Sequence, residues 1–238
     1  MPATPDPLTA AHYLDRLHAM QSDEELRKIQ RYFKSGKGDY GEGDRFIGVR
    51  MGHVFDLAKE FIDLPPREIE ALLESDIHEA RAGAVSVMNK QASHRRTSNE
   101  RRRELFDLYL RRHDRINNWD LVDLGAQHVV GRYLADKPRD VLFKLAASPN
   151  MWERRTALYA TFHFVRNGDT QDALAIAERL VEDSEDLIQK AVGAVLRSVG
   201  GEELIAFLDR HAARMPRTML TTAMEHLNAE QKAHYRSL

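Results

Sequence analysis

Helical spacing of apolar residues along almost the whole chain is the feature that most limits how it can fold. Apolar side chains recur at three- and four-residue steps, which place them on one face of a helix. Two neighbouring segments illustrate this pattern with Ala173, Ile176, Ala177, Leu180 and Val181 in the first, and Ile188, Ala191, Val192 and Val195 in the second. No segment shows the alternation typical of a half-buried strand. The sequence therefore predicts an all-α fold.

Turn residues separate these apolar stripes and set the ends of the predicted helices. Asn167-Gly168-Asp169 interrupts one pattern, and Gly200-Gly201 follows another, as expected where helices end. We predict thirteen helices, at residues 8–20, 22–34, 48–62, 66–74, 76–92, 98–113, 118–134, 137–147, 150–166, 169–182, 185–198, 202–213 and 216–227.

Repeated helix pairs account for the spacing in the second half of the chain. Trp152 and Ile188, near the starts of two equivalent predicted helices, stand 36 positions apart. This distance suits a HEAT-type repeat, in which each pair buries its apolar face by stacking on its neighbours. We therefore predict an α-solenoid of antiparallel helix pairs, HEAT-like, forming a single domain over residues 1–238.

Composition and missing motifs exclude several kinds of site. The chain has no cysteine and a formal net charge of −2, so thiolate chemistry is excluded and nucleic-acid binding would need local charge clusters. No stretch has the roughly 20 apolar residues needed to span a bilayer, and the start lacks the pattern of a signal peptide, so we expect a cytoplasmic protein. The histidines lack metal-ligand spacing, and His128 is interpreted as a packing residue, so we expect neither a metal nor a cofactor.

A glycine-rich segment at residues 35–44 contains the pattern G-x-G-x-x-G from Gly36 to Gly41. It follows a helical pattern, whereas dinucleotide binding requires a preceding strand. We interpret it as a loop near the binding face.

An aspartate within an apolar stripe is the first candidate for chemistry. Trp119, Asp123, Ala126 and Val130 share one helix face, and a carboxylate on such a face suits a cleft. The alternative is a structural Asp123 beside an ordinary core tryptophan. Asp120 faces elsewhere in the first turn, where the helix dipole favours an acid, and is interpreted as structural.

Cations in unusual positions are the second group of candidates. Arg155 shares an apolar line with Met151, Leu158 and Phe162, so it either pairs with a buried acid or emerges to hold a phosphate. Lys190 and Arg197 lie opposite the core stripe of their helix, on a face that is either solvated or binding. Residues 94–115 hold eight arginines, which form either a phosphate-facing patch or a plain exposed helix.

Several segments together resemble the AlkD family of bacterial DNA alkylation-repair glycosylases. They follow one another along nearly the whole chain: YFKSGKGDYGEGDRFIGVR at 32–50, NNWDLVD at 117–123, SPNMWERRTALYATFHFVR at 148–166, DLIQKAVGAVLR at 186–197 and HAARMPRTML at 211–220. The resemblance implies a C-shaped HEAT-like solenoid that removes N3- and N7-alkylated purines from double-stranded DNA without flipping the base.

The resemblance also implies roles for particular residues. Asp123 would be the catalytic carboxylate and Trp119 an aromatic contact to the deoxyribose of the damaged nucleotide. Arg155 and Arg197 would bind backbone phosphates. We predict that Trp152, Arg154 and Lys190 belong to the same DNA-binding surface, and that the protein acts as a monomer.

One position departs from the family pattern. Where such sequences typically read Gly-Trp, this chain has Gly193-Ala194, so the second aromatic wall of the site is missing. This departure favours an alternative, a non-catalytic HEAT-repeat protein that binds distorted or branched DNA. A third hypothesis is a scaffold that binds partner peptides in an apolar groove.

Overall fold

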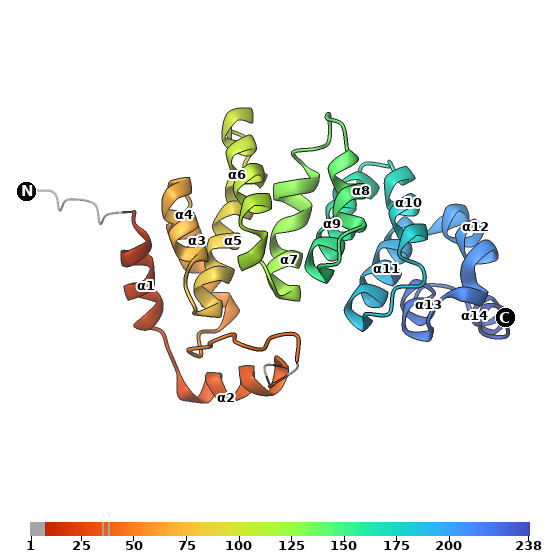
Figure 1. Ribbon diagram of the computed structural model, residues 1–238, viewed down its shortest axis with the longest axis horizontal. Coiled ribbons are helices and arrows are strands. Elements are labelled where there is room, and N and C mark those ends of the chain that lie inside the picture. The colour runs from red at the N-terminus through yellow and green to blue at the C-terminus, as the bar shows by residue number, and fades with distance from the viewer. Residues whose placement is uncertain (1–7, 35, 38) are drawn as a thin grey trace, which may run out of the picture. The chain divides into compact units, whose positions relative to one another are not determined.

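The computed structural model describes residues 8–34, 36–37 and 39–238, and these residues form fourteen α-helices with short 3₁₀ and π segments (Figure 1). Within them the only β pairing is an isolated bridge between Arg45 and Ile77. The all-α prediction is confirmed. The chain divides into two compact units, Met1–Gly125 and Ala126–Leu238, so the single domain stays a prediction.

The first unit holds seven α-helices that follow one another from red to green in Figure 1. Their bounds are α1 Ala10–His18, α2 Asp23–Tyr32, α3 Met51–Glu60, α4 Pro66–Leu73, α5 His78–Ser93, α6 Asn99–Arg111 and α7 Trp119–Gly125, with a 3₁₀ turn η1 at His113–Arg115. Helix α5 is the centre of this unit, because α3, α4, α6 and α7 all pack against it. Thirteen of its sixteen residues are buried, as expected for a helix enclosed on all sides.

The second unit begins with a π-helical segment η2 and continues with seven α-helices. The bounds are η2 Ala126–Gly131, α8 Asp140–Ala146, α9 Met151–Val165, α10 Gln171–Arg179, α11 Asp186–Val199, α12 Gly201–His211, α13 Arg217–Ala223 and α14 Ala229–Arg236, with a 3₁₀ turn η3 at Ala212–Arg214. Helix α9 packs against η2, α8, α10 and α11, and α11 packs in turn against α13. Stacking of successive helices within each unit is the arrangement of an α-solenoid.

The structure differs from the predicted helices in two places. The helix predicted over 118–134 changes at Ala126 from α to π geometry. Near this change, a Cβ at Gly125 would lie 2.6 Å from the Tyr109 ring, so close packing fixes the backbone there. The second difference is helix α14, whose start carries a capping box between Asn228 and Gln231. That sequence signal was present and was overlooked.

A buried carboxylate holds the segment between α2 and α3. Glu79, fully buried in the first turn of α5, accepts hydrogen bonds from the backbone N–H groups of Ile47, Gly48 and Val49 at 2.9–3.3 Å. Gly48 has a φ of +81°, and a Cβ there would lie 2.2 Å from the Ser22 carbonyl oxygen. These hydrogen bonds to Glu79 hold the preceding residues against α5, where Phe33, Asp44 and Phe46 contact His78.

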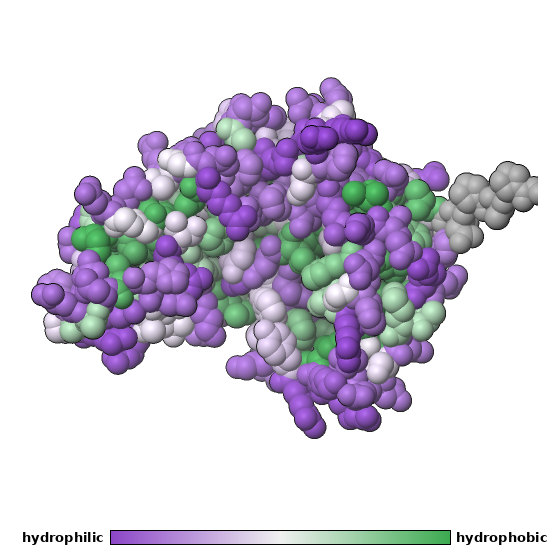
Figure 2. Space-filling view, turned by 180° about the vertical axis from the view of Figure 1, so that it is seen from behind, coloured by the Kyte–Doolittle hydropathy of each residue, from purple (hydrophilic) through white to green (hydrophobic). Residues whose placement is uncertain are grey.

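Hydrophilic residues occupy most of the face seen in Figure 2, with smaller hydrophobic areas between them. None of the described helices is long and apolar enough to cross a membrane.

Candidate functional site

An apolar cavity with a volume of about 610 Å³ lies within the first unit. Residues from the end of α2, from α3 and from α7 line it. They are Lys28, Ile29, Tyr32, Phe33, Met51, Phe55, Trp119, Asp120, Asp123 and Leu124. Its walls are therefore apolar and aromatic, with two carboxylates contributed by one helix.

Trp119 stands at the start of α7 in a cluster of aromatic rings. The Phe33 ring stacks on its indole, with centroids 5.4 Å apart and planes 15° apart. The Tyr32 ring meets the same indole edge-on at 5.8 Å. Phe33 is buried, whereas Tyr32 is 69% exposed, so Tyr32 places an aromatic ring in solvent beside the cavity.

Asp123 lies one turn after Trp119 and lines the same cavity. Both side chains are half-buried, and the four-residue step puts them on one helix face. The cavity thus brings together the two residues that the sequence assigned to chemistry. A carboxylate beside aromatic rings is an environment in which a cationic group is stabilised.

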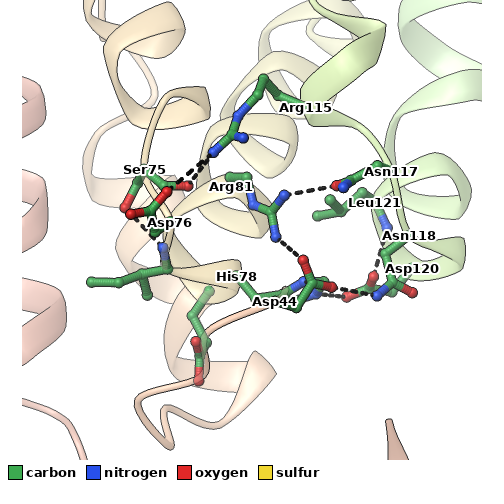
Figure 3. A network of polar contacts seen from close by, with 12 residues as sticks. Asp44, Ser75, Asp76, His78, Arg81, Arg115, Asn117, Asn118, Asp120 and Leu121 are labelled. Atoms are coloured by element: carbon green, nitrogen blue, oxygen red, sulfur yellow. Dashed lines mark hydrogen bonds and ion pairs between the residues drawn. The ribbon is translucent and has the colours of Figure 1, made fainter. Parts of the chain in front are cut away.

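Asp120, which lines this cavity, also belongs to a network of buried charges (Figure 3). The His78 ring, fully buried at the start of α5, contacts Asp120 through Nε2 at 2.7 Å and Asp44 through Nδ1 at 3.2 Å. Arg81 pairs with the second oxygen of Asp44. One imidazole therefore joins the 44–46 segment to the first turn of α7.

These contacts change the protonation of the network. Burial alone lowers the pKa of His78, but the Asp120 and Asp44 carboxylates outweigh burial and raise it to about 9. Burial also raises the pKa of Asp44, and the hydrogen bond from His78 together with the charge of Arg81 overcomes this and lowers it to about 2. At neutral pH the network contains an imidazolium held between carboxylates.

The same network fixes where α7 begins. Asn118, fully buried, donates to Asp44 at 2.7 Å and accepts from the backbone N–H of Trp119 at 2.8 Å. Arg81 donates to Asn117 at 2.7 Å. Asp120 accepts from the backbone N–H of Leu121 at 2.9 Å, which is a structural contact, but it also lines the cavity with Trp119 and Asp123 instead of facing elsewhere. The start of α7, where Trp119 lies, is thus anchored by polar contacts.

Arg155 and Trp152, predicted to bind DNA, lie on α9 in the second unit and are both buried. The Arg155 guanidinium donates to the Leu187 carbonyl at 2.7 Å and to the Tyr159 hydroxyl at 2.8 Å, and it lies over the Tyr159 ring at 4.5 Å. Arg155 is therefore buried with carbonyl and hydroxyl acceptors, and its expected pairing with a buried acid stays a prediction. Its phosphate contact stays a prediction.

The other predicted cations have acidic neighbours. Arg154 donates to Asp183 at 2.8 Å. On α11, exposed Lys190 pairs with Asp186 at 2.6 Å, and Arg197 pairs with Glu225. Lys190, Arg197 and Ala194 lie away from the core, and the last two are half-buried. A DNA phosphate would have to replace Asp186 or Glu225 as the partner of these cations.

The arginines of residues 94–115 are mostly engaged within the protein. Arg101 and Arg102 donate to carbonyl groups of Leu64 and Ala92. Arg112 pairs with Glu70 of α4 and with Glu74, the C-cap of that helix. These contacts favour the interpretation of a structural helix over that of a phosphate-facing patch, although Arg95 and Arg96 are exposed.

Tyr32, Phe33 and His78 were missed by the sequence analysis. The letters YF at the end of α2 were the available signal, because an aromatic pair closing an otherwise polar helix is unusual. Of the glycine-rich segment, Ser35 and Gly38 lie outside the described residues, and Gly41 donates to the Lys34 carbonyl at 3.0 Å. Among the described residues, no group of histidine and acidic side chains could hold a metal ion.

Comparisons with known proteins agree with this architecture. The family model for DNA alkylation repair enzymes matches residues 13–227. Among solved structures, the chain is similar to a protein described as a predicted DNA alkylation repair enzyme from Enterococcus faecalis. That similarity has 17% sequence identity and a TM-score of 0.68, and it covers 88% of this chain and 98% of that chain. None of the curated proteins compared with the chain matches it. Because the family model spans most of its length, the chain belongs to the DNA alkylation repair enzyme family.

Proposed function

We propose that the protein is a monofunctional DNA glycosylase that releases N3- and N7-alkylated purines from duplex DNA without flipping the base. The observation that carries this proposal is the placement of Trp119 and Asp123 on the wall of one cavity. Family membership supplies the context of DNA repair. The reaction as proposed needs no metal or cofactor, and we propose that a monomer performs it.

The chemistry of the lesion determines what the protein must provide. An N3- or N7-alkylpurine is already cationic, so it departs without protonation and takes the electron pair of its bond to C1′. The deoxyribose becomes oxocarbenium-like, and water then bonds to C1′ and loses a proton to solvent. The protein therefore needs chiefly a negative charge near C1′.

Asp123 can supply that charge. A carboxylate about 4 Å from the developing cation contributes roughly 4 kcal/mol at an effective dielectric near 20. This corresponds to a rate increase on the order of a thousandfold. Aromatic edges and faces beside the cation add about 0.5–2 kcal/mol, and both Trp119 and exposed Tyr32 are placed to contribute.

Release of 7-methylguanine from methylated duplex DNA tests the proposal. We expect Asp123→Asn to lower single-turnover release by about a thousandfold while leaving DNA affinity unchanged. Asp63→Asn is the matched control, because Asp63 is exposed and does not line the cavity. Full activity of Asp123→Asn would remove this residue from the mechanism.

A second candidate function is recognition of distorted or branched DNA without excision. Two observations favour it: Ala194 replaces the expected aromatic residue, and Phe33 already covers one face of Trp119. Salt-dependent binding with no base release, in the natural protein and in Ala194→Trp, would select this function. Base release by the natural protein would reject it.

A further inference from the structure

The cavity of the first unit extends from solvent to the start of α7. Among the residues that line it, Lys28 and Tyr32 are exposed, whereas Phe33 and Asp120 are buried. Its volume of about 610 Å³ lies in the range of about 300–1,000 Å³ that is usual for sites of small organic ligands. All of its lining residues belong to the first unit. A small ligand therefore finds a complete site within that unit.

The walls of this cavity match a flat, cationic ligand. The rings of Phe33 and Tyr32 lie 5.4 and 5.8 Å from the Trp119 indole, and Phe55 of α3 adds a fourth aromatic side chain to the lining. Asp123 places a carboxylate among them. Aromatic rings and carboxylates both attract a cation.

The same lining is poorly suited to a phosphate. Lys28 is the only cation among the described residues that line the cavity, and its Nζ pairs with Glu24 at 2.7 Å and with Glu25 at 2.8 Å. A phosphate would also meet the carboxylates of Asp120 and Asp123, which repel it. The charges of the cavity therefore select for a cationic base with its sugar and against a phosphodiester.

The cations that were expected to hold the DNA backbone are engaged within the second unit. Arg154, Lys190 and Arg197 each pair with an acidic residue, and Arg155 is buried. A phosphate would have to displace the acidic partners of the first three. The cavity, in contrast, presents its aromatic wall without any exchange of ion-pair partners.

We propose that the protein also hydrolyses free N7-alkylated purine deoxynucleosides, which carry the cationic base and the sugar but no phosphate. This activity rests on the chemistry of the proposed function, because it uses the same cavity and Asp123. A free nucleoside has no partner strand and no neighbouring bases, so its base can enter the cavity together with the sugar. The C1′–N9 bond breaks with its electron pair going to N9, and the base leaves neutral. A water oxygen then bonds to C1′, and its proton goes to solvent.

Hydrolysis of N7-methyl-2′-deoxyguanosine by the full chain tests this activity. Chromatography measures the 7-methylguanine formed, after subtraction of the rate in buffer alone. We expect saturable release by the natural protein and about a thousandfold less by Asp123→Asn. Unmodified 2′-deoxyguanosine, whose base is neutral, should not be hydrolysed. A rate with the natural protein equal to that in buffer alone would overturn the proposal.

A variant of the cavity wall tests whether the nucleoside uses this site. Phe55→Leu should raise the KM for the nucleoside roughly 2- to 30-fold, because one aromatic side chain is lost. Phe143→Leu is the matched control, because Phe143 is half-buried on α8 and does not line the cavity, so this variant should keep the natural KM. An unchanged KM in Phe55→Leu would overturn the assignment to this cavity.

Competition supplies a second measurement of the site. The nucleoside should inhibit base release from methylated duplex DNA with an inhibition constant equal to its own KM. Hydrolysis of the nucleoside without such inhibition would place it at another site and would also overturn the proposal.

Comparison of the two substrates separates this activity from the proposed function. Release from methylated duplex DNA but not from the nucleoside would reject the nucleoside activity alone. Release from the nucleoside but not from the duplex would reject the duplex glycosylase and support the nucleoside activity. Release from neither substrate would reject both.

Discussion

His78 and Asp120 are joined by a hydrogen bond of 2.7 Å between two buried side chains, 42 positions apart in the chain. Because Asp120 is in the first turn of α7, one residue after Trp119, this bond links the central helix α5 to the helix that carries the candidate site. The aromatic and carboxylate face of α7 therefore depends on a network of buried charges, of which Asp120 also lines the cavity.

Replacing His78 should destabilise the protein strongly. His78→Gln leaves Asp44 and Asp120 buried without the charge between them, and breaking a buried pair in this way costs about 3–5 kcal/mol. Urea unfolding measures the change. His226→Gln, at an exposed position, should stay within about 0.5 kcal/mol of the natural protein. A similarly small change for His78→Gln would show that the network does not stabilise the fold.

The network also predicts how stability depends on pH. The pKa of His78 is raised from 6.5 to about 9, so its contribution is complete below pH 6.5 and is lost as pH rises through 9. The pKa of Asp44 is lowered from 3.8 to about 2, so its contribution is complete above pH 3.8 and is lost as pH falls toward 2. Free energies of unfolding between pH 3 and 10 should therefore fall at both ends. The alkaline fall should be smaller in His78→Gln, and an identical fall in both proteins would contradict the assignment.

Tyr32 should contribute to the reaction without contributing to stability. Its ring is 69% exposed, so Tyr32→Ala should unfold at nearly the natural urea concentration. Loss of the aromatic edge beside the cavity should lower single-turnover base release by roughly 3- to 30-fold. Tyr32→Phe keeps the ring and should keep the rate. Equal rates for the alanine variant and the natural protein would remove Tyr32 from the site.

Two glycines with similar positive φ angles allow the cost of backbone strain to be measured apart from the cost of a steric clash. Gly43 and Gly48 have φ of +88° and +81°, but a Cβ at Gly43 meets nothing within 4 Å, whereas one at Gly48 meets the Ser22 carbonyl oxygen at 2.2 Å. Gly43→Ala should cost about 1–2 kcal/mol from the left-handed conformation alone. Gly48→Ala should cost more, since the α2 to α3 segment must also move. Chemical denaturation compares the two, and equal losses would show that the clash is relieved.

Glu225 competes with DNA for Arg197 if that arginine binds a phosphate. Glu225→Gln removes the acid paired with Arg197 and should raise duplex affinity about threefold, because exposed ion pairs contribute up to roughly 1 kcal/mol. Glu230→Gln, exposed on α14, removes the same charge elsewhere and is the control. Fluorescence anisotropy at fixed salt measures both. Equal affinities would argue against a phosphate contact by Arg197.

The sequence by itself determined the helices and the relation between Trp119 and Asp123. Both depend on local geometry, because a four-residue step places two side chains on one face whatever surrounds the helix. The positions of Lys190 and Arg197 away from the core were predictable for the same reason. The start of α14 at Asn228 was also readable, through its capping box.

Only the tertiary structure decided what surrounds those residues. Phe33 reaches Trp119 across 86 positions of sequence, His78 joins Asp44 to Asp120, and burial turns Arg155 toward the Leu187 carbonyl. Helical periodicity gives the face of a residue but carries no information on which distant segment will pack against it. Long-range packing therefore determines that Phe33 stacks on Trp119 and that His78 pairs with Asp44 and Asp120. It also determines the protonation of His78 and Asp44.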